Sequence, residues 1–365
     1  MKAAFFSPVF YLAPAPGGWP TPGICYSPQE ARRSMLTALE QFRLADEVGF
    51  DWVTVAEHHY GPIGLTPNPM VFAGALTQVV KRARIALLGP NIPMLNPVRV
   101  AEEFAMLDTL TDGRIVAGML RGTPNEYVTY NTNPAESREI FEEAVLLIRC
   151  AWTETQPFGW EGRHFQFRSI SIWPRPVQQP HPPMFMSGSS PESAEFAARN
   201  RISLGLAVTT VPLAAKSAAL YRERARAAGW EPQPDNVLYR LSFHVADSDA
   251  RARADLEESR RQPQRLSPVK ANLALEAAVA TTGYYGSNVA DQRDRMLESH
   301  GLDERIAAGQ IVIGGADSVL SQIRHIADRL GPGILDLVPA FQTGEPTLRS
   351  IRLFGDKVLP RIRDW

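Results

Sequence analysis

The chain has 365 residues, of which 44% are hydrophobic and 21% are charged, as in an ordinary globular protein. Its 38 basic and 39 acidic residues nearly cancel, so the sequence gives no electrostatic reason to expect binding to nucleic acid or to an anionic membrane. The two cysteines, Cys25 and Cys150, form no spacing pattern, which argues against a disulfide framework and a cysteine-rich metal site. No apolar run approaches the roughly 20 residues of a bilayer span and no secretory signal pattern is present. We therefore expect a soluble cytoplasmic protein.

Strand-like and helix-like segments alternate along the chain. The expected strands are 2–7, 51–59, 84–91, 114–122, 184–189, 203–209, 237–246 and 334–341. Helices are expected over 28–48, 68–81, 97–110, 133–152, 213–228, 249–261, 317–330 and 346–358, with another opening at Ser190. Several helix starts carry a Ser or Asn cap followed by proline, among them Ser27, Asn96, Asn133 and Ser190. In 249–261, the spacing favours ion pairs between Asp249 and Arg253 and between Glu257 and Arg261 on a solvated face.

Eight strands, each followed by a helix, predict a single-domain TIM (β/α)8 barrel with insertions. The insertions are a long loop at 8–26, a hairpin and proline-rich segment at 158–183, and a segment at 262–311 of irregular pattern that is a candidate cover for the active site. A doubly wound open sheet is the alternative, but it leaves the last strand without a closing partner. In a barrel, functional residues lie at the carboxyl ends of the strands.

The second expected strand ends in Glu57, His58 and His59, which suit a metal site, acid–base chemistry or a polar strand end. The chain has neither an HExxH nor an HxH motif, and adjacent residues on a strand point to opposite faces. We therefore expect no metal here. Strand alternation places His58 at the barrel mouth on the same face as Thr54, and it leaves Glu57 and His59 to hold the strand end and its loops.

A second group of residues suits an anion. Gly188, Ser189 and Ser190 precede a helix, whose first N–H groups and dipole favour a phosphate. Arg121 leaves a buried strand, and Arg138 lies in the second turn of a helix, where positive charge gains nothing from the dipole. Convergence of these groups would form a phosphate clamp. The sequence leaves that open, because Ser190 also serves as an ordinary helix cap and the arginines as surface residues.

The segments AEHHY…NPMVFAGAL, LNPVRVAEEFAMLDTLTDGRIVAGMLRG, ESREIFEEAVLLI and FMSGSSPESAEFAA resemble the bacterial luciferase-like flavin monooxygenases. The resemblance extends over nearly the whole chain and is strongest over 51–200. It implies a TIM-like barrel, reduced FMN supplied by a separate flavin reductase, and O2 as co-substrate. It also implies transfer of one oxygen atom to a small organic substrate and a homodimer.

The resemblance also assigns residues. His58 matches a histidine that lines the reaction chamber and takes part in catalysis. FMN-binding positions are matched by Leu88, Gly89, Arg121, Arg138, Gly188, Ser189 and Ser190, with Ser193 as a further phosphate contact. The resemblance implies a non-prolyl cis peptide under the flavin near Leu88-Gly89 and a mobile loop near 262–311.

Some positions depart from the luciferases. GSS replaces AES at the phosphate site, Leu120 stands where luciferase has a reactive cysteine, and 125–131 differs in character. We therefore expect no bioluminescence. The segments NEYVTYN and FYLAPAP favour a roomy, partly aromatic site for a hydrophobic substrate. The alternatives are a deazaflavin-dependent oxidoreductase on the same fold, a non-catalytic flavin-binding protein and a metal-dependent hydrolase.

Overall fold

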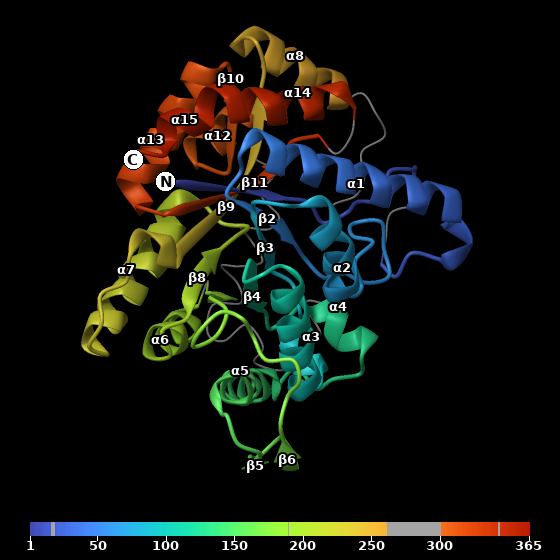
Figure 1. Cartoon of the computed structure of the whole chain (residues 1–365). Coiled ribbons are helices and arrows are strands. Elements are labelled where there is room, and N and C mark those ends of the chain that lie inside the picture. Colours follow the sequence, from blue (N-terminus) through green and yellow to red (C-terminus); the bar gives the residue numbers. More distant parts are fainter. Residues whose placement is uncertain (16–18, 189, 261–300, 342–343) are drawn as a thin grey trace.

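Eight parallel strands close into a barrel that is surrounded by helices (Figure 1). The computed structural model describes residues 1–15, 19–188, 190–260, 301–341 and 344–365. The barrel strands are β1 (Lys2–Phe6), β2 (Trp52–Val55), β3 (Arg84–Leu87), β4 (Ile115–Met119), β7 (Met184–Ser187), β8 (Ser203–Leu206), β9 (Val237–Val245) and β11 (Ile334–Pro339). β1 pairs with both β2 and β11. The predicted barrel is confirmed, and the open sheet is wrong because β11 finds its closing partner in β1.

A further strand, β10 (Ile311–Gly314), extends the sheet beside the barrel. β8 pairs with the first residues of β9, and β10 pairs with the last residues of β9 along the same edge. The expectation of an irregular 262–311 segment is wrong for its described end, which holds α12 (Leu302–Ala307) and the start of β10. A four-residue apolar strand is too short to show the alternation that marks longer ones. Residues 262–300 lie outside the described residues, so a cover there stays a prediction.

The principal helices lie around the barrel (Figure 1). They are α1 (Pro28–Val48), α2 (Pro69–Val79), α3 (Pro97–Leu110), α5 (Ser137–Thr153), α6 (Pro191–Arg199), α7 (Val211–Ala227), α8 (Asp249–Arg260), α13 (Ala316–Leu330) and α14 (Glu345–Leu353). Shorter helical segments are α4 (Pro124–Thr129), α15 (Leu359–Ile362), 3-10 turns at Gly23–Cys25, Ile92–Met94 and Pro234–Asn236, and a π turn at Phe354–Val358. The predicted hairpin forms from β5 (Phe158–Glu161) and β6 (Gln166–Ile170), which pair in antiparallel register.

The predicted helix caps hold at several starts. The Ser27 hydroxyl accepts the N–H of Glu30 at 3.3 Å, and the Asn96 side chain accepts the N–H of Val98 at 3.0 Å. These bonds satisfy N–H groups that have no partner inside the helix. Proline directly after each of these two caps removes one more such donor, which explains why Ser27-Pro28 and Asn96-Pro97 predict these starts correctly.

The helix expected from Asn133 begins instead at Ser137. The Asn133 side chain accepts the N–H of Ala135 at 3.1 Å, and the Ser137 hydroxyl donates to the carbonyl of Pro134 at 2.7 Å. These local bonds form a turn that competes with a helical backbone, as Asn and Ser side chains commonly do. The sequence analysis also missed the short helix α4, which lies in the stretch noted only for its departure from luciferase.

Several strands end earlier than expected. β2 ends at Val55 rather than at His59, and β3 ends at Leu87 rather than at Asn91. Beyond these ends, side chains bond backbone groups that strand pairing no longer serves. For example, the Thr66 hydroxyl donates to the carbonyl of Ala56 at 2.6 Å. An isolated bridge between Asn91 and Leu120 continues the sheet pattern locally. The polar residues therefore lie on loops that leave the barrel mouth.

Two apolar layers position that mouth. Outward-facing residues such as Val53 and Val55 pack in the core cluster that also contains residues of the surrounding helices. Inside the barrel, an apolar plug consists of Ala4, Trp52, Ala86, Leu88, Val116, Phe185, Leu238 and Ile334. The Trp52 and Phe185 rings meet edge to face with centroids 5.4 Å apart. Trp52 and Ile334 are the first residues of their strands, so this part of the plug fills the amino end of the barrel, whereas Leu88 follows the end of β3. In such barrels chemistry takes place at the carboxyl end.

Asp46 fastens α1 to the turn that precedes β3. Its buried carboxylate accepts the backbone N–H groups of Lys81, Arg82 and Ala83 at 2.9, 3.0 and 2.7 Å. We expect Asp46→Ala to lower the free energy of unfolding by about 2–4 kcal/mol, because it leaves buried donors without an acceptor. Urea unfolding measures the loss. The control is Glu47→Ala, which removes an exposed ion pair to Arg43 and is expected to cost less than about 1 kcal/mol.

The flanks of residues 261–300 are joined to each other and to the barrel. Asp249 accepts the N–H of Gly315 at 2.7 Å, and Arg253 pairs with Asp303 at 2.6 Å. The ion pair expected between Asp249 and Arg253 is therefore wrong, because each side chain finds a partner on the far flank. Arg261, which belongs to the second expected pair, lies outside the described residues.

Candidate active site

Glu57 and His59 join the loops that follow β2 and β3. One Glu57 oxygen accepts the Asn91 side-chain amide at 2.8 Å and the His59 Nε2–H at 3.1 Å. The other accepts the Asn91 backbone N–H at 3.3 Å. All three side chains are buried, and the His59 carbonyl accepts the indole N–H of Trp19 at 2.9 Å. These contacts agree with the supporting role expected for the pair.

His58 points to a different partner. Its side chain is 33% exposed, and its Nδ1 lies 3.7 Å from Oε1 of the buried Glu126. The other Glu126 oxygen accepts the Thr123 backbone N–H at 2.7 Å and the Thr123 hydroxyl. A Cβ added to Gly64 would lie 3.1 Å from the His58 Cβ, so glycine permits the loop to pack against the histidine. His58 is thus oriented from two sides and still reaches solvent.

The sequence analysis missed Glu126. Thr123-Pro124-Asn125-Glu126 has the form of a capping box, in which a Thr cap and a Glu three residues later bond each other's backbone. That pattern could have predicted α4, and with it a Glu126 carboxylate held in place just beyond β4. It could not have predicted the contact with His58, because the two residues lie on different loops.

The pKa of the Glu126 carboxyl is shifted by competing effects. Burial raises it, but the interaction with His58 and the bonds from Thr123 outweigh burial and hold the pKa below its ordinary value of 4.5. A carboxyl whose pKa is lowered on folding stabilises the fold above its unfolded pKa. This contribution is lost as the pH falls through the folded pKa.

Glu126→Gln is therefore expected to lower the free energy of unfolding by about 1–3 kcal/mol at pH 7. The difference from wild type should shrink as the pH falls below 4.5, because the protonated wild-type carboxyl then resembles an amide. Urea unfolding at several pH values between 7 and 3 gives this profile. Glu345→Gln, at a side chain 70% exposed, is the control and should show little difference at any pH. A Glu126→Gln difference that is constant with pH would contradict the prediction.

Arg121, Arg138 and the start of α6 converge. Arg138 Nη2 lies 3.9 Å from Glu192 Oε2 in the first turn of α6. The pKa of Glu192 is lowered chiefly by its own backbone N–H, then by the Ser190 hydroxyl and by the positive charges of Arg138 and Arg121. Burial raises the pKa of Glu142, while the same two arginines oppose that rise. The structure thus places Arg138 at this helix start, whereas Arg121 is linked to it through its electrostatic effect on Glu192 and Glu142. The phosphate clamp stays a prediction.

The small residues at this helix start are partly described. Ser190 caps α6 by accepting the Ser193 N–H at 3.3 Å, and its hydroxyl donates to the Ser193 hydroxyl at 3.1 Å. A Cβ at Gly188 would overlap the Leu204 side chain, so a larger residue there requires that side chain to move. Ser189 lies outside the described residues, and its predicted phosphate contact stays a prediction.

The expected non-prolyl cis peptide near Leu88-Gly89 is wrong for the described residues. Their cis bonds precede Pro20, Pro174 and Pro180. A trans bond is the ordinary state of a non-prolyl peptide. A Cβ at Gly89 would lie 2.5 Å from the Ala56 Cα, so the two loop backbones meet directly at this point. The loops beyond β2 and β3 therefore approach closely because Gly89 has no side chain, and the peptide bond there is trans.

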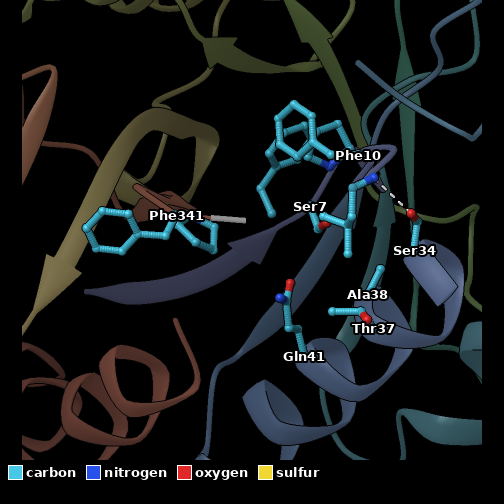
Figure 2. A pocket seen from close by; sticks show the side chains of 11 residues that line it. Ser7, Phe10, Ser34, Thr37, Ala38, Gln41 and Phe341 are labelled. Atoms are coloured by element: carbon cyan, nitrogen blue, oxygen red, sulfur yellow. Dashed lines mark hydrogen bonds between the residues drawn. The ribbon is translucent and has the colours of Figure 1, made fainter. Parts of the chain in front are cut away.

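A small pocket, with a cavity volume of about 10 Å³, lies at the ends of β1 and β11 (Figure 2). Its polar lining comes from Ser7 and from Ser34, Thr37 and Gln41 of α1. The Ser34 hydroxyl accepts the Leu12 N–H at 2.9 Å, so the loop after β1 is tied to the helix. This pocket and the His58 and arginine groups lie beyond the carboxyl ends of different barrel strands.

Among the described residues, no group of three or more His, Cys, Asp or Glu side chains has the arrangement of a metal site. Within the same ranges, no helix combines the length and the apolarity needed to cross a bilayer.

The fold is a parallel (β/α)8 barrel with polar side chains, among them His58, Glu126 and Arg138, beyond the carboxyl ends of its strands. The chain belongs to the luciferase-like monooxygenase family, a flavin-dependent family whose model matches residues 16–332. The luciferase-like family predicted from the sequence is therefore confirmed.

Sequence relatives agree with this assignment. The protein y4wF of Sinorhizobium fredii is 36% identical over 160 residues, which are 42% of this chain and 45% of that relative, so less than half of its length is matched. The alkanal monooxygenase alpha chain of Photorhabdus luminescens is 26% identical over 332 residues, or 88% of this chain and 90% of that one. The oxygenase component of the flavin-dependent trigonelline monooxygenase of Acinetobacter baylyi is 28% identical over 178 residues, or 48% of each chain.

Solved structures share the whole architecture. The monooxygenase RslO1 of Streptomyces bottropensis has a TM-score of 0.77 and 26% identity and covers 99% of both chains. The FMN-bound oxygenating constituent of 3,6-diketocamphane monooxygenase of Pseudomonas putida has a TM-score of 0.76, 18% identity and 99% coverage of both chains. An F420-dependent secondary alcohol dehydrogenase has a TM-score of 0.71 and 19% identity and covers 100% of this chain and 99% of that one. The last two likenesses show the fold alone.

Proposed function

We propose that this protein is the oxygenase component of a two-component, FMN-dependent monooxygenase. It takes reduced FMN from a separate flavin reductase and uses O2 to insert one oxygen atom into an organic, hydrophobic substrate. The observation that carries the proposal is the convergence of Arg121 and Arg138 on the start of α6, at the same barrel end as His58. The relative described as an oxygenase component supports the need for a reductase, and the FMN-bound neighbour supports FMN.

The charges at this site fit the phosphate of FMN. Two guanidinium groups and the first N–H groups of a helix form a donor set for a phosphate dianion. The Glu192 carboxylate is attracted to the same cations, which marks the place where an anion is stabilised. We assign Arg121, Arg138 and Ser190 to hold the phosphate, with Gly188, Ser189, Leu88 and Gly89 as the further FMN contacts inferred from sequence.

The remaining residues set up a dry and oriented reaction chamber. Bound reduced FMN supplies the electrons for O2 activation. Glu126 lies on the Nδ1 side of His58 and thereby directs the opposite ring nitrogen, Nε2, to hold or transfer a proton at the reacting atoms. The apolar plug inside the barrel would exclude water from the region below bound FMN.

Anaerobic titration with reduced FMN tests the proposal. Saturable binding is expected, followed after O2 addition by flavin reoxidation that is slower than for free reduced FMN, because the chamber shields it. Absence of binding would contradict the proposal. Anaerobic reduction of an added deazaflavin coenzyme by an organic substrate, without binding of reduced FMN, would favour the deazaflavin-dependent alternative.

A further inference from the structure

A polar cluster lies inside the barrel, among the inward-facing side chains above the apolar plug. The buried Asp336 carboxylate accepts the Thr54 hydroxyl on one oxygen at 2.6 Å and the Arg240 Nε–H on the other at 2.6 Å. The Thr54 and Asp336 side chains are fully shielded from solvent. The cluster joins β2, β9 and β11 inside the barrel. Each oxygen of the Asp336 carboxylate accepts a hydrogen bond from one partner, Thr54 or Arg240.

Arg240 is held in place by two contacts that leave the hydrogen-bond donors of its terminal nitrogens available. The ring of Phe6 supports one face of its guanidinium, with Cζ 3.6 Å from the ring centroid. Its Nε donates to Asp336, whereas within the described ranges neither terminal nitrogen donates a hydrogen bond to a protein acceptor. The side chain is 19% exposed. On β9, β11 and β2, the cluster residues come two positions after the plug residues Leu238, Ile334 and Trp52. Since side chains alternate along a strand, the cluster lies one inward-facing layer nearer the carboxyl mouth.

The charge balance selects the ligand class. Asp336 already neutralises Arg240, and a second carboxylate on the terminal nitrogens would lie close enough to Asp336 to be repelled. A carbonyl or hydroxyl oxygen accepts from the guanidinium edge without that repulsion. A buried ion pair is also weak evidence for a purely stabilising role, because apolar residues of similar volume often serve equally well.

We propose that Arg240 is a substrate-positioning residue that donates from its terminal nitrogens to a carbonyl or hydroxyl oxygen of an uncharged substrate. The inference rests on the proposed function and deepens it, since it makes the substrate an oxygenated rather than a pure hydrocarbon molecule. The Phe6 ring beneath the guanidinium would carry the apolar part of such a molecule. Phe6 also lines the pocket at the end of β1.

Equilibrium dialysis with three probes of matched shape tests the inference: 2-acetylnaphthalene, 2-ethylnaphthalene and 2-naphthoate. Each is measured with the FMN-free protein and with the protein saturated anaerobically with reduced FMN. Wild type is expected to bind the ketone about 10- to 100-fold more tightly than the hydrocarbon, the range of a charge-assisted hydrogen bond. It should also bind the ketone more tightly than the carboxylate.

The variant Arg240→Gln is expected to lose the preference for the ketone while keeping its affinity for the hydrocarbon. Arg240→Gln alone leaves the Asp336 carboxylate buried without its cation. The double variant Arg240→Gln/Asp336→Asn removes both charges of the ion pair and so repeats the test without a buried unpaired charge. Equal binding of ketone and hydrocarbon by wild type, tighter binding of the carboxylate, or no binding of any probe would overturn the inference. Failure of reduced FMN to bind would refute the proposed function instead, and the FMN-free titrations would still decide the role of Arg240.

Discussion

Replacement of Arg138 by alanine is expected to raise the Kd for reduced FMN about 10- to 100-fold, as loss of one charge-assisted bond to phosphate implies. Arg121→Ala should have an effect of similar size, because both guanidinium groups act on the same helix start. Anaerobic fluorescence or absorbance titration measures both values. The physical reason is that the charges of Arg138 and Arg121, together with the Glu192 backbone N–H and the Ser190 hydroxyl, lower the pKa of Glu192 in the first turn of α6 and favour negative charge there.

Two matched variants sharpen this test. Arg199→Ala removes an exposed arginine at the far end of α6 and should leave the Kd unchanged. Glu192→Gln removes the carboxylate that competes for Arg138, so it should tighten binding by a few-fold. An Arg138→Ala variant that binds reduced FMN as wild type does would place the phosphate elsewhere on the barrel.

Replacement of His58 by alanine is expected to lower kcat about 10²- to 10⁴-fold, the usual contribution of a positioned acid–base group. The Kd for reduced FMN should stay nearly unchanged, because His58 lies beyond β2 whereas the arginines and α6 lie beyond β4 and β7. Single-turnover product formation from reduced FMN, O2 and substrate separates the two quantities.

The control for this variant is His325→Ala, at an exposed position on α13 that has no expected part in turnover. Glu126→Gln should reduce kcat less than His58→Ala does, because Glu126 only orients the imidazole. Full turnover by His58→Ala would remove the main argument against a non-catalytic flavin-binding protein.

The sequence predicts the barrel well because its elements are marked locally. Apolar strands and helices capped at Ser27 and Asn96 depend on residues within a few positions of one another. Strand ends were less predictable, since polar residues such as His59 fit a strand pattern and a loop pattern equally. The short β10 lacked the length that makes periodicity visible.

The site could be predicted only in part, for a related reason. His58 and the arginines stand out because polar residues are unexpected after buried strands. Their partners do not stand out, because contacts such as Thr54 with Asp336 join residues that are 282 positions apart and depend on closure of the ring. Arg240 and Asp336 lie within strands whose apolar neighbours dominate the pattern.

The bonds between Asp249 and Gly315 and between Arg253 and Asp303 have an evolutionary consequence. They join α8 to the segment that begins with α12 through residues 249, 253, 303 and 315, all of which lie outside 261–300. Substitutions within 261–300 remove none of these bonding groups. Descendants of this sequence can therefore vary there and keep the residues that form this junction.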